Sequence, residues 1–195
     1  MKKLILMTTV LIFSMVMFSS SVNAQMKSNK PRASLKAMVM QRIGVDTDIT
    51  IDYSRPGVKG RKIWGDLVPW GMAPAGKEAK NPYPWRGGAN ENTTIEFSKD
   101  VMVDGNKLPA GKYSVHFIPE ESEWTVIFNK NSKMWGSFTY DQKDDALRIK
   151  VKPVEAPMTE WLEYGFDNLA GTSCTAFLQW DKLKVPFTIT TADKM

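Results

Sequence analysis

Two short strings in this sequence combine residue types that can bind a ligand. The first, WRGGANE, spans residues 85–91 and places a tryptophan and an arginine beside two glycines, an asparagine and a glutamate. Small-molecule sites pair aromatic surfaces with a few directional polar groups, and glycine lets the backbone come close to a ligand. The string therefore predicts either a ligand-binding loop or a tight turn that is anchored by its tryptophan.

The second string, SRPGVKGRK, spans residues 54–62 and is strongly basic. Arginine offers planar, bidentate donors, so this string is a candidate site for an anion or a polar ligand. The alternative is a solvated basic loop whose arginines donate to loop carbonyl groups. Together, the two strings give these candidate ligand-binding residues: Arg55, Lys59, Arg61, Trp85, Arg86, Asn90 and Glu91.

Both strings lie in one irregular segment, residues 54–92, which we call the connector. It contains five of the 11 prolines, seven of the 13 glycines and three of the seven tryptophans. A long segment without regular structure in a compact domain is either disordered or functional, and disordered segments contain few aromatic residues. We therefore expect the connector to be packed, with residues 73–81 forming an exposed tip.

Hydrophobic residues elsewhere in the chain alternate with polar ones, which is typical of strands with one buried face. Turn signals such as Asp104-Gly105 separate these runs. No helical period is sustained, so we expect an all-β fold of roughly eight to ten short antiparallel strands, a single β-sandwich or jelly-roll-like domain. The alternating runs are 49–53, 113–117, 124–128, 147–151, 162–166, 174–180 and 185–189.

The N-terminus has the layout of a secretory signal peptide. Two lysines precede an apolar run from Leu4 to Phe18, and Val22-Asn23-Ala24 supplies a cleavage site before Gln25. This run is shorter than the roughly 20 residues that a spanning helix needs. We therefore expect a signal peptide at 1–24, a flexible leader at 25–33 and the β-sandwich at 34–192. The mature protein would be periplasmic or extracellular, with no membrane span.

Charge and cysteine content restrict the class of protein further. Without the two signal lysines, 24 basic residues face 21 acidic ones, a net charge of +3 that is too balanced to favour nucleic acid. The connector alone carries seven basic and three acidic residues, so the positive excess is local to it. Cys174 is the only cysteine, which excludes an internal disulfide and makes it a candidate buried apolar residue.

No metal site or cofactor is expected from the remaining polar residues. His116 is the only histidine and has no cysteine or carboxylate at ligand spacing, so we expect a surface or hydrogen-bonded structural role. The acidic string at 141–145, DQKDD, lacks the glycine of a calcium loop. It is therefore expected to be a solvated turn.

Several long strings resemble, in order, the exported bacterial family called domain of unknown function 2911. They are YSRPGVKGRKIWGDLVPWG (53–71), WRGGANENTTIEF (85–97), LPAGKYSVHFIP (108–119) and EWTVIFNKNSKMWG (123–136), and the resemblance runs from about Ala33 to the C-terminus. It implies an exported, mostly β domain and singles out the arginine-rich and GAN strings. It transfers no catalytic role. An extra segment, roughly 73–84, departs from the family pattern.

Three functions remain open at this point. The leading one is a non-catalytic binding module for a small polar or anionic ligand, with a glycan fragment as one candidate. The second is a periplasmic hydrolase that uses Glu91, and the third is a structural or interaction protein of the cell envelope. The oligomeric state is not indicated by the sequence.

The topology predicts how the two strings come together. The strand that ends at Tyr53 and the strand that begins at Thr93 are neighbours in sequence and are expected to pair antiparallel. The two ends of the connector then meet at one mouth of the sandwich. We therefore expect Arg86, Asn90 and Glu91 to cluster with Arg55 or Arg61, with Arg55 and Glu91 placed to pair.

Overall fold

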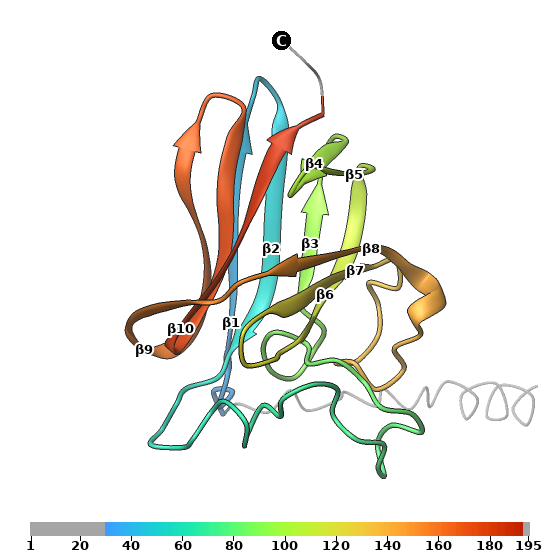
Figure 1. The fold of residues 1–195 in the computed structure, drawn as a ribbon, viewed down its shortest axis with the longest axis vertical. Coiled ribbons are helices and arrows are strands. Elements are labelled where there is room, and N and C mark those ends of the chain that lie inside the picture. The colour runs from blue at the N-terminus through green and yellow to red at the C-terminus, as the bar shows by residue number, and fades with distance from the viewer. Residues whose placement is uncertain (1–29, 193–195) are drawn as a thin grey trace, which may run out of the picture. The chain divides into compact units, whose positions relative to one another are not determined.

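The computed structural model describes residues 30–192, and apart from one 3-10 turn their regular secondary structure is all β strand (Figure 1). The predicted signal peptide and residues 25–29 of the predicted leader lie outside the described residues. Within residues 30–192, no helix is long and apolar enough to cross a membrane. The strands are β1 (Leu35–Ile43), β2 (Thr47–Arg55), β3 (Thr94–Phe97), β4 (Val101–Val103), β5 (Asn106–Leu108), β6 (Gly111–Ile118), β7 (Trp124–Asn129), β8 (Asp145–Val151), β9 (Val154–Ala170) and β10 (Ser173–Thr191).

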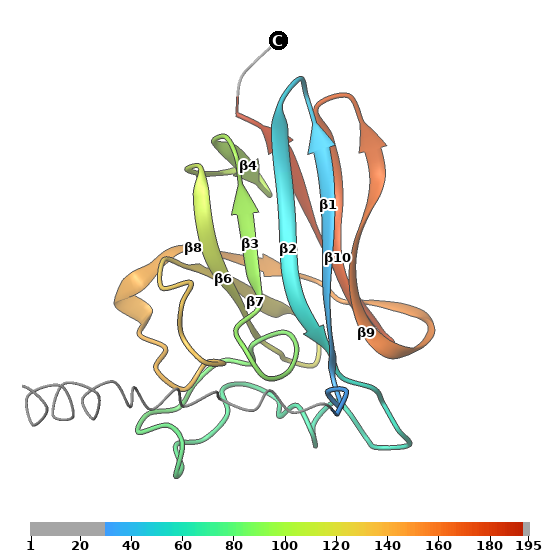
Figure 2. The same cartoon turned by 180° about the vertical axis from the view of Figure 1, so that it is seen from behind.

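The strands form two antiparallel sheets that face each other, which confirms the predicted sandwich (Figures 1 and 2). The larger sheet has the order β1-β2-β3-β6-β7-β8, and the smaller has the order β5-β4-β10-β9. β2 pairs with β3 antiparallel, in the register Asp52 to Thr94, as the order of the strands along the chain predicts. The two ends of the connector consequently leave and re-enter the larger sheet side by side.

Alternation along the strands builds the core between the sheets. Ile49, Ile51 and Tyr53 of β2 are buried, while the polar residues between them are half-buried on the outer face. The same pattern on β10 buries Cys174 with the other apolar residues, and burial raises the pKa of its thiol to about 11. A thiol in this state is a small apolar core residue, as the sequence predicts.

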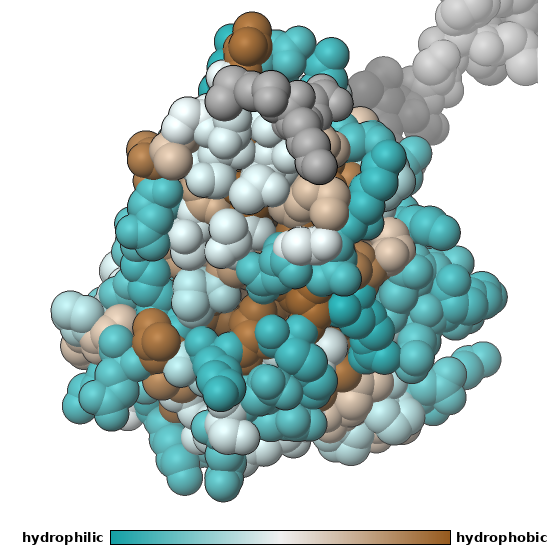
Figure 3. Space-filling view, turned by 45° about the horizontal axis from the view of Figure 1, so that its top comes forward, coloured by the Kyte–Doolittle hydropathy of each residue, from teal (hydrophilic) through white to brown (hydrophobic). Residues whose placement is uncertain are grey.

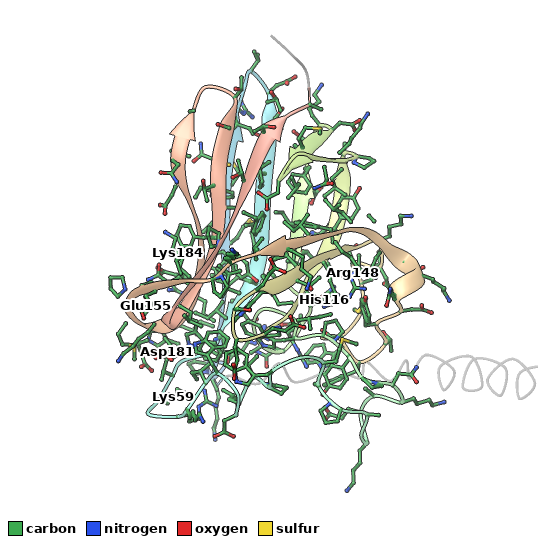
Figure 4. The ribbon with its side chains drawn as sticks, in the orientation of Figure 1. Lys59, His116, Arg148, Glu155, Asp181 and Lys184 are labelled. Atoms are coloured by element: carbon green, nitrogen blue, oxygen red, sulfur yellow. The ribbon has the colours of Figure 1, made fainter. Side chains whose placement is uncertain are left out.

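Two strands are much longer than the short strands that the sequence predicts. β9 and β10 pair along most of their length, and the two runs predicted at 174–180 and 185–189 are parts of one strand. The register shifts on both sides of Asp181, whose φ is +52°, so the strand carries a bulge there (Figure 4). A bulge bends a strand. β10 pairs with β9 on both sides of Asp181, as far as Lys184, and it pairs with β4 through Ile189–Thr191 on its other edge.

The outer face of the larger sheet is covered in its second half. Apart from a single 3-10 turn at Gln142–Asp144, residues 130–144 form a loop, which we call the β7–β8 loop. Beneath it, Ser114, His116 and Asn129 are fully buried although they point away from the core. The alternation predicts that the outer face of these strands is exposed to solvent. The β7–β8 loop covers that face, which explains why these polar residues are buried.

Candidate functional site

The connector is bonded into both sheets at one end of the sandwich (Figures 1 and 2). Its first part extends the smaller sheet, since Val58 N donates to Glu160 O at 2.8 Å and Leu162 N donates to Pro56 O at 3.0 Å. Its last part extends β6, since the backbones of Trp85 and Phe117 exchange two hydrogen bonds of 2.7 and 2.8 Å. The prediction of a packed connector is therefore confirmed.

Four tryptophans join the connector to the core. Trp64 and Trp85 of the connector pack against Trp124 of β7 and Trp180 of β10. The rings of Trp85 and Trp180 are stacked, with 6.1 Å between centroids and 16° between planes, and Trp64 meets Trp124 edge-on at 5.0 Å. This cluster closes the end of the core and fixes the position of the connector's polar residues.

The WRGGANE string makes the tight turn that its glycines predict. Gly87 has a φ of +60°, and a Cβ there would lie 2.3 Å from the hydroxyl of Tyr164, which donates to the Gly87 carbonyl at 2.9 Å. A Cβ on Gly88 would lie 2.9 Å from the carbonyl oxygen of Ser54. Only glycine allows the turn to approach β2 and β9 this closely.

Arg86 is held inside this turn rather than in solvent. Its guanidinium donates to the carbonyl of Asn90 and lies over the ring of Phe138, 4.8 Å from the centroid. Gly136 of the β7–β8 loop packs directly against it, because a Cβ on Gly136 would lie 2.4 Å from the guanidinium carbon. Burial lowers the pKa of Arg86, so its charge is partly removed from water.

A cavity of about 380 Å³ lies between the connector and the end of the sandwich. Four of the seven candidate residues line it, namely Arg61, Trp85, Arg86 and Asn90. The volume falls within the usual range for small-molecule sites, roughly 300–1,000 Å³. The other residues of its wall are Ser34, Pro56, Leu67, Val68, Pro69, Gly71, Ala73, Tyr83, Pro84, Gly88, Ala89 and Trp180.

The other three candidate residues are not part of this wall. Arg55 donates to the Leu162 carbonyl at 2.8 Å and forms an ion pair of 3.2 Å with Glu163. Lys59 is exposed on the connector (Figure 4), with its ammonium 5.5 Å from the ring of Trp161.

Glu91 forms an ion pair with Arg32, so the expected pairing of Arg55 with Glu91 is wrong. The physical reason is the alternation of β2, in which Arg55 occupies the same face as Tyr53 and Ile51. That face points toward β9, where Arg55 finds Glu163. Glu91 lies beside β2 instead, with its carboxylate 3.5 Å from the Ser54 hydroxyl.

Part of the cavity wall comes from residues that the sequence did not single out. The segment 73–84 is tied at its base by two hydrogen bonds between the backbones of Ala73 and Tyr83, and both residues line the cavity. Most of the predicted tip, residues 73–81, is exposed, but Ala73 is half-buried and Ala79 is buried. In the sequence, Trp180 is one more buried residue in the alternation of β10. Nothing local distinguishes it as part of a binding site.

His116 is not part of the cavity wall and is buried beneath the β7–β8 loop (Figure 4). Its Nε2 is 2.9 Å from the Ser114 hydroxyl and its Nδ1 is 2.8 Å from the Ser137 hydroxyl. Burial, with a smaller contribution from Arg86, lowers the pKa of His116 to about 3. It is a neutral, hydrogen-bonded structural residue. Across residues 30–192, no group of three or more His, Cys, Asp or Glu side chains could hold a metal ion.

On the face seen in Figure 3, hydrophobic colour appears only in small areas within a polar surface. Most of the exposed large apolar side chains belong to two edge strands, β1 (Leu35, Met38, Met40) and β9 (Val154, Met158, Trp161, Leu169). Exposed apolar side chains alone do not mark a small-molecule site. The cavity is therefore the better candidate for a functional site.

No curated protein and no solved structure matches this chain. A family model described as "Protein of unknown function (DUF2911)" matches residues 34–189, which include every strand except the last two residues of β10. The match covers the four strings on which the resemblance rests and the whole connector that builds the cavity. The chain therefore belongs to the DUF2911 family.

Proposed function

We propose that this protein is an exported binding module that holds a small polar or anionic molecule in the connector cavity. The observation that carries the proposal is the composition of the wall, where Arg61, Arg86 and Asn90 face the same space as the indole of Trp85. A mostly apolar pocket with a few convergent polar groups is the usual form of a small-molecule site.

The hydrogen bonds that hold the arginine side chains of the cavity wall also favour binding. Its polar side chains are held by neighbours, since Arg61 donates to the carbonyls of Gly57 and Val58 and Arg86 donates to that of Asn90. Side chains that are fixed before a ligand arrives lose little rotamer freedom on binding. A glycan fragment and an organic anion both remain within this proposal.

A hydrolase that uses Glu91 receives no support from this geometry. A general acid on a glycosidase needs a raised pKa, whereas the hydrogen bond from Arg32 lowers the pKa of Glu91. The described wall of the cavity contains no aspartate or glutamate that could act in its place. A purely structural role is consistent with the arginine bonds to loop carbonyls, but it gives no reason for the open space beside them.

Export remains part of the proposal and rests on the N-terminal sequence. The basic start, the apolar run and the small residues before Gln25 support cleavage after Ala24. Exported proteins often rely on disulfides, and this chain has only one cysteine. Packing of four tryptophans closes the end of its core instead.

The proposal is tested by filling the cavity. Ala89→Phe places a large ring on the wall, while Ala110→Phe changes an exposed alanine on the turn before β6 and serves as the control. The probe is a library of soluble sugars, organic acids and amides, and binding is followed by backbone amide NMR of residues 34–192.

We expect some compounds to shift the amides of residues 85–90 in the wild type and in the control, and none to do so in Ala89→Phe. Compounds that shift only amides remote from the cavity, or that bind Ala89→Phe equally well, would show that the cavity is not the site.

A further inference from the structure

The described arginines fall into two classes by their partners. Arg32, Arg42, Arg55 and Arg148 each form an ion pair with an aspartate or a glutamate. Arg61 and Arg86 form none among residues 30–192, and these two are the arginines that line the cavity. Among residues 30–192, the two arginines without an ion pair therefore both line the same cavity.

Neither of these guanidiniums has used all of its donors. Arg61 donates through Nε to Val58 O at 3.1 Å and through Nη2 to Gly57 O. Arg86 donates through Nη1 to Asn90 O. A guanidinium carries more N–H donors than these bonds occupy, and their fixed fork matches the oxygens of a carboxylate or a phosphate.

Burying the Arg86 guanidinium without a carboxylate partner costs free energy. Its side chain is enclosed by Phe138, Gly136 and its own turn, so its charge has lost part of its hydration without gaining a carboxylate. A half-buried charge is normally paired, because desolvation is otherwise uncompensated. Glu78, the acid that acts on it through space, is exposed on the 73–84 segment and makes no ion pair with it.

Most of the other residues of the wall are apolar. Trp85 and Tyr83 supply half-buried aromatic surface, and Trp180, which stacks on Trp85, is itself buried. The prolines at 56, 69 and 84 are the rigid aliphatic residues of the wall. The described wall has no aspartate, glutamate or lysine. Sugar hydroxyls need acceptors as well as donors, and among the side chains of the wall only Asn90, Ser34 and Tyr83 carry oxygen acceptors, none of them charged.

From these four observations we propose that the ligand is a small organic anion. Its carboxylate or phosphate group pairs with Arg86 and Arg61, and its apolar body lies against the half-buried indole of Trp85, which the buried Trp180 supports. This inference rests on the proposed function and narrows it, because it selects an acid over a neutral glycan.

The experiment compares matched probes by isothermal titration calorimetry on the mature chain. Each pair is an aromatic or alicyclic carboxylate and its uncharged carboxamide, and monoester phosphates, inorganic phosphate and neutral mono- and disaccharides complete the set. The variants are Arg86→Gln, Arg86→Lys and Arg61→Gln. Arg42→Gln, which removes an exposed ion pair at the far end of β1, is the control.

We expect carboxylates or phosphate monoesters to bind at least about tenfold more tightly than their amides or than sugars, as the loss of charge-assisted hydrogen bonds implies. Binding of the acids should weaken about tenfold or more in Arg86→Gln and in Arg61→Gln. It should be restored only in part in Arg86→Lys, which lacks the fork, and should be unchanged in Arg42→Gln. Added salt should weaken the binding of the acids and leave the binding of the amides unchanged. The phosphate probes decide which acid group fits.

Two results separate this inference from the function on which it rests. If amides or saccharides bind the cavity as tightly as the acids, the ligand is not an anion, although the binding function stands. If no probe binds the folded wild type, the binding function fails and the inference fails with it. The salt series on the wild type gives a result even where a variant does not fold.

Discussion

The indole of Trp85 lies nearly parallel to the indole of Trp180, at an angle of 16° and with 6.1 Å between the ring centroids. One ring comes from the connector and the other from β10, and both line the cavity. Trp85 is thus at once an anchor that packs against the core and a surface that a ligand can touch. Both sequence interpretations of Trp85, anchor and ligand platform, are therefore compatible with its position.

Trp85→Ala should therefore destabilise the fold as well as the cavity. Removing a ring that packs against Trp64, Trp124, Trp180 and Phe117 is expected to cost about 3 kcal/mol, the lower end for tryptophan because the side chain is half-buried. Trp135→Ala, at an exposed ring, should cost less than about 0.5 kcal/mol. Urea unfolding measures both, and equal losses would contradict the packing described here.

Gly87→Ala should damage the turn far more than Gly60→Ala. Both glycines have positive φ, so both substitutions carry backbone strain of about 1–2 kcal/mol. A Cβ on Gly60 meets nothing within 4 Å, whereas one on Gly87 would overlap Tyr164 and Phe117. The overlap should add about 1–3 kcal/mol. Thermal unfolding of the two variants checks this, and a similar Tm for both would show that the turn is looser than the structure has it.

His116 should remain neutral in the folded protein through the whole physiological range. The chain has one histidine, so its imidazole gives a single set of NMR signals that can be followed against pH. The folded pKa of about 3 lies below the ordinary value of 6.5, so between these values the unfolded chain binds a proton that the folded chain does not. Stability contributed by this site is complete above pH 6.5 and falls as pH drops toward 3.

The loss below pH 6.5 should approach about 1.4 kcal/mol per pH unit for one proton. His116→Asn should remove this slope while lowering stability at pH 7, where Ser114 and Ser137 lose a partner. An imidazole that titrates near pH 6 in the folded state would contradict the sealed position of His116.

Protein recovered from the cell envelope should begin at Gln25. The apolar run from Leu4 to Phe18 and the small residues before Gln25 are the reason for this expectation. N-terminal sequencing gives the answer, with an Ala24→Pro variant as the control, since proline in place of the small residue before the cleaved bond should block processing. Recovery of intact Met1 in a cytoplasmic fraction would exclude export.

Much of the fold follows from local pattern. Strands such as β2, β6 and β7 have buried apolar residues at every second position, so the sequence predicts them directly. β1 is not predicted, because it is an edge strand whose exposed Met38 and Met40 obscure the alternation. The sequence also fails to predict that β10 continues across Asp181. The bulge there interrupts the alternation, so the pattern predicts two strands instead of one.

The site is predictable only in part, for a similar reason. Residue type and spacing identify Arg61, Trp85, Arg86 and Asn90, which share one cavity. The partners of Arg55 and Glu91 depend on β9 and on Arg32, which are remote in sequence. The sequence shows where charged residues are concentrated. The tertiary fold decides which of them form ion pairs.

The central claim is that the connector cavity binds a small anion, and a crystal structure of residues 25–195 with the tightest acid ligand tests it most directly. We predict ligand density inside the cavity, with acid oxygens about 2.7–3.2 Å from the guanidinium nitrogens of Arg86 and the ligand body against Trp85. Ligand density elsewhere on the sandwich, with the space beside Arg86 filled by the connector itself, would contradict the account.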